Sequence, residues 1–131
     1  MERRGRQRAG IVAHVALGVV GGAALAGLAP WLTGLLFGRG AKTDSATAGW
    51  YGLAFICISW ATPLIRNILI PRGKSGIVFR SSILSVVVGL SVMALGIKTG
   101  HIWMIAMGMA LSELVSFLVC GPAAWRLLHA R

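Results

Sequence analysis

Acidic residues are the scarcest chemical class in this sequence. Its 131 residues include 3 Asp and Glu against 13 Lys and Arg, and only 12% are charged. A soluble domain usually carries about 25% charged residues, so this chain lacks the charge to cover a water-facing surface. Hydrophobic residues make up 56% of the chain, and the mean hydropathy is +0.80. The composition therefore excludes a sizeable soluble domain and predicts a single domain solvated by lipid.

The formal net charge of +10 would suggest nucleic-acid binding in a soluble protein. Here the basic residues sit at the ends of apolar runs, and there is no soluble module to carry a basic patch. This distribution favours contacts with anionic lipids at the membrane boundaries. We therefore expect membrane lipids, and no nucleic acid, among the partners.

Cysteine is also rare, with 2 residues, and shows no chemical pattern. Cys57 and Cys120 both lie within apolar runs, where Cys behaves as a small apolar residue. No His/Cys cluster has the spacing of a metal site. The sequence also contains no nucleophile–base pair, no phosphate-binding Gly-rich loop after a strand and no paired carboxylates. We therefore expect no metal, no cofactor and no enzymatic activity.

Four long apolar runs predict an all-α, polytopic membrane protein, because a span requires roughly 20 apolar residues. The first run is free of charge from Gly10 to Gly38 and is too long for a signal peptide. Pro30 should bend or restart its helix, and Pro63 should kink the second helix. The predicted spans are about 10–29, 47–70, 77–97 and 101–125. They form a transmembrane domain of residues 10–125 between basic segments 1–9 and 126–131.

The distribution of basic residues predicts the topology. If the N-terminus is cytoplasmic, ten basic residues face inside and three face outside. The inside set is Arg3, Arg4, Arg6, Arg8, Arg66, Arg72, Lys74, Arg80, Arg126 and Arg131, and the outside set is Arg39, Lys42 and Lys98. This bias predicts a multi-pass protein of the bacterial inner membrane with both termini in the cytoplasm.

Small residues at four-residue spacing mark the expected helix contacts, because close backbone approach drives helix association in lipid. We interpret these stripes as packing surfaces rather than a substrate path. They are Gly18 and Gly22 in the first span, Ser81, Ser85 and Gly89 in the third, and Gly108, Ser112 and Ser116 in the fourth.

Polar residues in or beside the spans are the remaining candidates for function. Glu113 is the only acid inside a span, so it must be protonated, paired or open to an aqueous cavity. It could couple transport to an ion, but we favour a neutral side chain hydrogen-bonded to a neighbouring helix. Arg66, Asn67 and Arg80 flank the cytoplasmic turn and could bind a phosphate headgroup, although contact with ordinary phospholipid is the favoured interpretation.

Three segments resemble polysaccharide-biosynthesis transporters, the O-antigen or exopolysaccharide flippases of the MOP superfamily. They are LLFGRG (35–40), RNILIPRGKSGIVFRSSIL (66–84) and GHIWMIAMGMALSELVSFLV (100–119). The motifs consist of hydropathy with a few Gly, Arg and Glu positions. The resemblance is to the C-terminal region of that family and covers most of residues 10–121.

The resemblance implies a function and a larger fold. Such flippases move undecaprenyl-pyrophosphate-linked sugars from the inner to the outer leaflet, through two six-helix bundles that face a central cavity. This chain would correspond to the last part of the second bundle, as a truncated member, a fragment or a subunit. Glu113 and Arg66 are the only functional candidates at matching positions. The implied partners are a lipid-linked oligosaccharide and another chain that supplies the missing helices.

Other functions remain open on the sequence. The chain could belong to a drug or ion exporter of the same superfamily, to a small exporter that works as a dimer, or to a membrane subunit that transports nothing. A small exporter would usually carry its acid in an early helix, whereas Glu113 lies in the last. Under the favoured interpretation of Glu113, we expect the Glu113→Gln protein to retain export.

Overall fold

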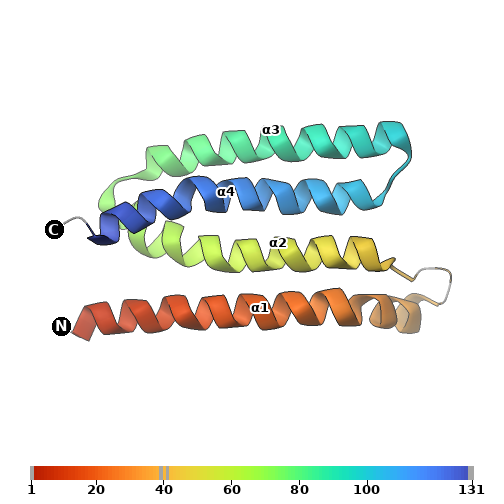
Figure 1. Ribbon diagram of the computed structural model, residues 1–131, viewed down its shortest axis with the longest axis horizontal. Helices are drawn as coiled ribbons and strands as arrows, with labels where there is room; N and C mark the ends of the chain where they lie inside the picture. Colours follow the sequence, from red (N-terminus) through yellow and green to blue (C-terminus); the bar gives the residue numbers. More distant parts are fainter. Residues whose placement is uncertain (1, 39, 41, 130–131) are drawn as a thin grey trace.

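The chain folds into four long helices, as shown in the computed structural model (Figure 1), which describes residues 2–38, 40 and 42–129, and side chains from residue 9 onward. Every regular element in this part of the chain is helical, which confirms the all-α prediction. The helices are α1 (Glu2–Phe37), α2 (Ser45–Leu64), α3 (Ser75–Thr99) and α4 (Trp103–His129). All four are long and apolar enough to cross a membrane, so the protein has the character of a multi-pass membrane protein.

The helices lie side by side in a row whose spatial order differs from the chain order (Figure 1). The row runs α1, α2, α4, α3, with α2 packed between α1 and α4, and α3 packed on α4. The two helices at the edges, α1 and α3, therefore each have one main neighbour. Many of their large apolar side chains are exposed, including Val20, Leu36 and Ile97. In a membrane protein such surfaces face lipid or other helices.

The two ends of the row differ in the number of basic residues that they carry. The start of α1, the end of α4 and the turn between α2 and α3 lie together at one end, and the other two connections lie at the opposite end (Figure 1). The first end carries Arg66, Arg72, Lys74, Arg80 and Arg126, and the second carries Lys42 and Lys98. Arg39 and Arg131 lie outside the described residues. The assignment of the first end to the cytoplasm stays a prediction.

Only one of the two prolines expected to interrupt a helix is followed by a break. Helix α1 continues through Pro30 to Phe37 without interruption. Helix α2 also contains Pro63, but it ends one residue later and continues as a π-helical turn, Ile65–Leu69, and a 3₁₀ turn, Ile70–Arg72. Because proline has no N–H, it removes a hydrogen bond from the preceding turn, and the backbone can widen nearby. At this widened turn Ile68 and Leu69 are buried, whereas Arg66 is exposed.

Helices α1 and α2 meet through glycine. A Cβ atom on Gly22 would lie 2.7 Å from the carbonyl oxygen of Gly52, and a Cβ on Gly52 would lie 2.5 Å from the carbonyl oxygen of Gly22. One turn earlier, a Cβ on Gly18 would lie 2.7 Å from the Ser59 Cβ. The helices can approach this closely only because these positions carry no side chain.

Helices α3 and α4 meet through a second set of small residues. A Cβ atom on Gly108 would lie 2.8 Å from the Gly89 carbonyl oxygen. Towards the basic end, the buried Ser81 Oγ lies 3.2 Å from the Cys120 Sγ. Cys120 also belongs to a buried apolar cluster with Ile68 and Leu69 of the π turn. This cluster joins α2, α3 and α4 and fixes the direction in which the turn leaves α2.

Candidate functional site: a polar groove between α3 and α4

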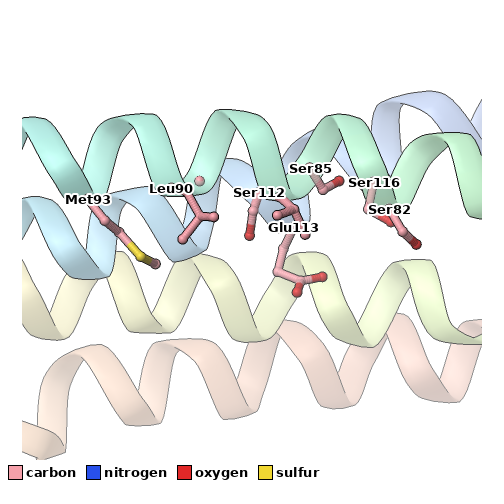
Figure 2. Close-up of a pocket in the computed structure, with 9 residues that line it drawn as sticks. Ser82, Ser85, Leu90, Met93, Ser112, Glu113 and Ser116 are labelled. Atoms are coloured by element: carbon pink, nitrogen blue, oxygen red, sulfur yellow. The ribbon is translucent and has the colours of Figure 1, made fainter.

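A groove lined by several polar side chains lies between α3 and α4 (Figure 2). Its volume is about 420 Å³. Four hydroxyl groups and one carboxyl group face it, and these belong to Ser82, Ser85, Ser112, Glu113 and Ser116. Its apolar wall consists of Val86, Gly89, Leu90 and Met93. The groove therefore combines the only acid within the spans with a concentration of serine.

Helical spacing explains why these residues meet. Ser82, Ser85 and Gly89 follow one another by three or four residues along α3, so they occupy one face of that helix. Ser112 and Ser116 stand in the same relation on α4. Since most of these side chains are small, the two helices pack closely at their backbones and leave open space above the contact.

The serine hydroxyls differ in how they are satisfied. Ser82 Oγ donates to the Val78 carbonyl oxygen at 3.0 Å, and Ser112 Oγ donates to the Met109 carbonyl oxygen at 2.8 Å. Ser85 is only 8% exposed, and its Oγ has no hydrogen-bond partner. A buried polar group left unpaired costs about 1–3 kcal/mol. Ser85 thus leaves an unused hydrogen-bonding group in the wall of the groove.

Glu113 is the second unsatisfied group. None of the described residues donates a hydrogen bond to its carboxyl group or forms an ion pair with it. Glu113 follows the start of α4 at Trp103 by ten residues, which corresponds to roughly 15 Å along the helix axis. The hydrocarbon core is about 30 Å thick, so the carboxyl group lies near mid-membrane depth. A charged side chain there costs about 2.5–3.5 kcal/mol on insertion scales.

Aromatic packing joins α4 to α2 beside the groove. Phe117 of α4, one turn after Glu113, meets Trp60 of α2 edge to face with 5.7 Å between the ring centroids. Ala106 and Ala110, also on α4, are fully buried. This packing helps to hold α4 in place between α2 and α3, and the groove itself is partly open to its surroundings.

The candidate headgroup-binding residues lie towards the basic end of the row. Arg66 and Asn67 are exposed on the π turn, and Arg80 is exposed on the second turn of α3. Ser82, which lines the groove, follows Arg80 by two residues. The groove therefore begins close to the basic end and extends from there towards mid-membrane depth.

The small-residue stripes form helix contacts and part of the groove, and Ser85 and Gly89 belong to both. Six of the eight residues lie at helix contacts, namely Gly18 and Gly22 between α1 and α2, and Ser81, Ser85, Gly89 and Gly108 between α3 and α4. Ser112 and Ser116 line the groove, and Ser112 also lies against Gly89. Ser82 and Val86 are groove residues that the four-residue stripes do not include. The three-residue step from Ser82 to Ser85 is the sequence signal that could have identified them.

Neither cysteine is among the residues that line the groove. Cys57 and Cys120 are both free thiols and both buried. Within the part of the chain that the structure describes, no group of three His, Cys, Asp or Glu side chains is placed to hold a metal ion. The chemistry available in the groove is therefore hydrogen bonding by hydroxyl groups and charge or hydrogen bonding by one carboxyl group.

Comparisons with protein-family models, with curated proteins and with solved structures give no match for this chain. The class of the protein thus follows from its fold: it is an all-helical protein with four helices of membrane-spanning length.

Proposed function

We propose that this chain is a membrane-embedded part of a transporter that moves lipid-linked sugars, of the undecaprenyl-pyrophosphate type, across the inner membrane. The observation that carries the proposal is the serine-lined groove with Glu113 near mid-membrane depth. Polar groups inside a membrane are costly and commonly line substrate or ion pathways. The resemblance of residues 35–40, 66–84 and 100–119 to polysaccharide flippases supports this choice of substrate class.

The chemistry of the proposed path matches the parts of such a substrate. A sugar carries many hydroxyl groups, which can exchange hydrogen bonds with serine hydroxyls as they leave water. The pyrophosphate group is anionic, and the exposed guanidinium groups of Arg66 and Arg80 can bind phosphate oxygens in pairs at the start of the path. The polyprenyl chain needs no site of its own because it can stay in the lipid beside the exposed apolar faces.

Four helices in a row form only one wall of such a path. The groove is open along one face (Figure 2), and a sugar crossing there would meet lipid on its other side. The proposal therefore includes further helices from another chain, which close the path and complete the transporter.

The test is to fill the groove in cells and to follow the leaflet in which the precursor accumulates. Val86→Phe places an aromatic ring at the groove, whereas Val87→Phe makes the same change one residue along α3, outside the groove lining. The two valines are equally exposed, at 55% and 57%, so they form a matched pair. The Val86→Phe protein should cause lipid-linked sugar to accumulate in the inner leaflet, and the Val87→Phe protein should support normal export.

Deletion of the gene separates the alternatives. Loss of surface polysaccharide with retention of its lipid-linked precursor supports the proposed substrate. Normal polysaccharide together with increased sensitivity to toxic cations would indicate a drug or ion exporter instead. If the Val86→Phe protein exports as well as the Val87→Phe control, the groove is not part of the path.

A further inference from the structure

The groove around Glu113 has a polar inner surface and no partner within the described chain. Ser85 Oγ is buried without a hydrogen bond, and the Glu113 carboxyl group receives none from the described residues. Both lie on the open face of the α3–α4 pair (Figure 2). Lipid tails can satisfy neither group, because hydrocarbon offers no donors or acceptors.

Charge complementarity indicates what covers this surface. A carboxyl group near mid-membrane depth is stabilised most by a positively charged side chain that approaches it in the same low-dielectric region. Serine hydroxyls on either side can accept further hydrogen bonds from the same cation. The geometry points to a transmembrane helix of another chain that carries a basic side chain at the depth of Glu113.

A second copy of this chain does not fit that description. Its described basic side chains lie towards the helix ends: Arg80 is on the second turn of α3, and Arg66 is in the π turn that follows α2. Copies inserted in the same orientation would bring Glu113 to the depth of another Glu113. The basic side chain therefore belongs to a helix that is not part of a second copy of this sequence.

This interface deepens the proposed function, on which it rests, by naming the chemistry of the chain that completes the path. The partner helix forms the opposite wall of the groove, and its cation neutralises Glu113. The two exposed apolar groove residues, Val86 at 55% and Leu90 at 60% exposure, then pack against the flanks of the partner helix.

The test measures binding of a synthetic helix to the intact protein in liposomes. The probe is a transmembrane peptide of about 20 leucine and alanine residues with one central lysine, and its control has leucine at that position. Energy transfer between labelled peptide and labelled protein reports association. The lysine peptide should bind the wild-type protein about tenfold more tightly than the leucine peptide.

Two variants test whether the preference for the lysine peptide depends on the groove. Glu113→Gln keeps the shape of the side chain and removes its charge, so the preference should disappear. Asp44→Asn removes the acid that precedes α2, outside the spans, and should leave the preference unchanged. Equal binding of the two peptides to the wild-type protein, or a preference that survives Glu113→Gln, overturns the inference.

A third measurement tests the alternative occupant. Ser82→Cys places a thiol at the groove, and oxidation to a covalent dimer through this thiol would assign the groove to a second copy and also overturn the inference. Peptide binding requires no transport. A wild-type protein that prefers the lysine peptide while its deletion leaves polysaccharide export intact would retain the interface and reject the proposed function.

Discussion

Gly89 offers the sharpest test of how α3 and α4 pack. A Cβ atom at this position would lie 2.9 Å from the Ser112 Cβ and 3.1 Å from the Gly108 carbonyl oxygen. Carbon atoms in comfortable contact are about 3.5–4.0 Å apart, so any side chain would force the helices apart by roughly 0.6–1.1 Å. We therefore expect Gly89→Leu to destabilise the protein.

The size of this effect follows from measurements on overpacked cores, where extra carbons cost about 1–3 kcal/mol. Leucine adds four carbons to a contact that has no room for the first, so the upper end of that range applies. An equilibrium constant changes about tenfold for each 1.4 kcal/mol. The folded fraction at a fixed denaturant concentration should fall accordingly, and the unfolding midpoint should shift downward.

The assay is denaturation in detergent micelles, followed by tryptophan fluorescence. Gly27→Leu is the matched control, because Gly27 also lies within a helix but has no atom within 4 Å of a Cβ built there. The control should unfold close to the wild-type midpoint. Equal midpoints for Gly89→Leu and Gly27→Leu would refute the close packing of α3 on α4.

Three further predictions concern the helix end, the thiols and the topology. Hydrogen bonding from the Thr47 side chain, together with the Thr47 backbone N–H that donates to the Asp44 side chain at 3.2 Å, holds the pKa of Asp44 below its ordinary value of 3.8. Asp44 therefore stabilises the fold above its unfolded-state pKa, and this stabilisation is lost as the pH falls through the lower folded-state pKa. The Asp44→Ala variant should remove this acid dependence in unfolding measurements. An unchanged pH profile would contradict a stabilising role for the hydrogen bond at the start of α2. Cys57 and Cys120, at 4% and 0% exposure, should react with a maleimide only after unfolding, and rapid labelling of the folded protein would show that the helices are not packed as described. Reporter fusions should place residues 71–76 in the cytoplasm and residues 39–47 outside, and a periplasmic signal from 71–76 would reverse the topology.

The helices themselves follow from the sequence, whereas their order in space does not. Four apolar runs separated by Gly-containing turns predict four spans, and turns at Gly73 and Gly100 indeed adopt left-handed backbone angles with φ near 70°. Small-residue stripes occur in the first, third and fourth runs, so they show that helices meet without showing which ones. The neighbours of α4 depend on side chains such as Trp60 and Phe117, whose contact no local pattern predicts.

The prolines and Glu113 also show where prediction from the sequence stops. Pro30 and Pro63 are both candidate breaks, yet α1 continues through Pro30, and the π turn follows Pro63. The outcome depends on the tertiary contacts of each helix, since buried Ile68 and Leu69 hold the widened turn in the core. The sequence marks Glu113 as unusual, but only the arrangement of α3 and α4 places it in a groove with four serines.

Glu113 is also where the account departs from the sequence-based expectation. The sequence alone favours a local hydrogen bond and hence retained export after Glu113→Gln. Among the described side chains, however, none satisfies the carboxyl group, and our proposals assign it to a partner helix. The account therefore predicts that loss of the charge weakens assembly of the transporter.

The most direct test of the central claim is polysaccharide export in a strain whose only copy of the gene encodes Glu113→Gln. Expression and detergent stability are matched to the wild-type protein, and Asp44→Asn serves as the control for loss of an acid. The account predicts that the Glu113→Gln protein folds normally and that surface polysaccharide is lost while its lipid-linked precursor remains in the inner leaflet. Normal surface polysaccharide from this strain would contradict the claim that the groove at Glu113 belongs to a transport path.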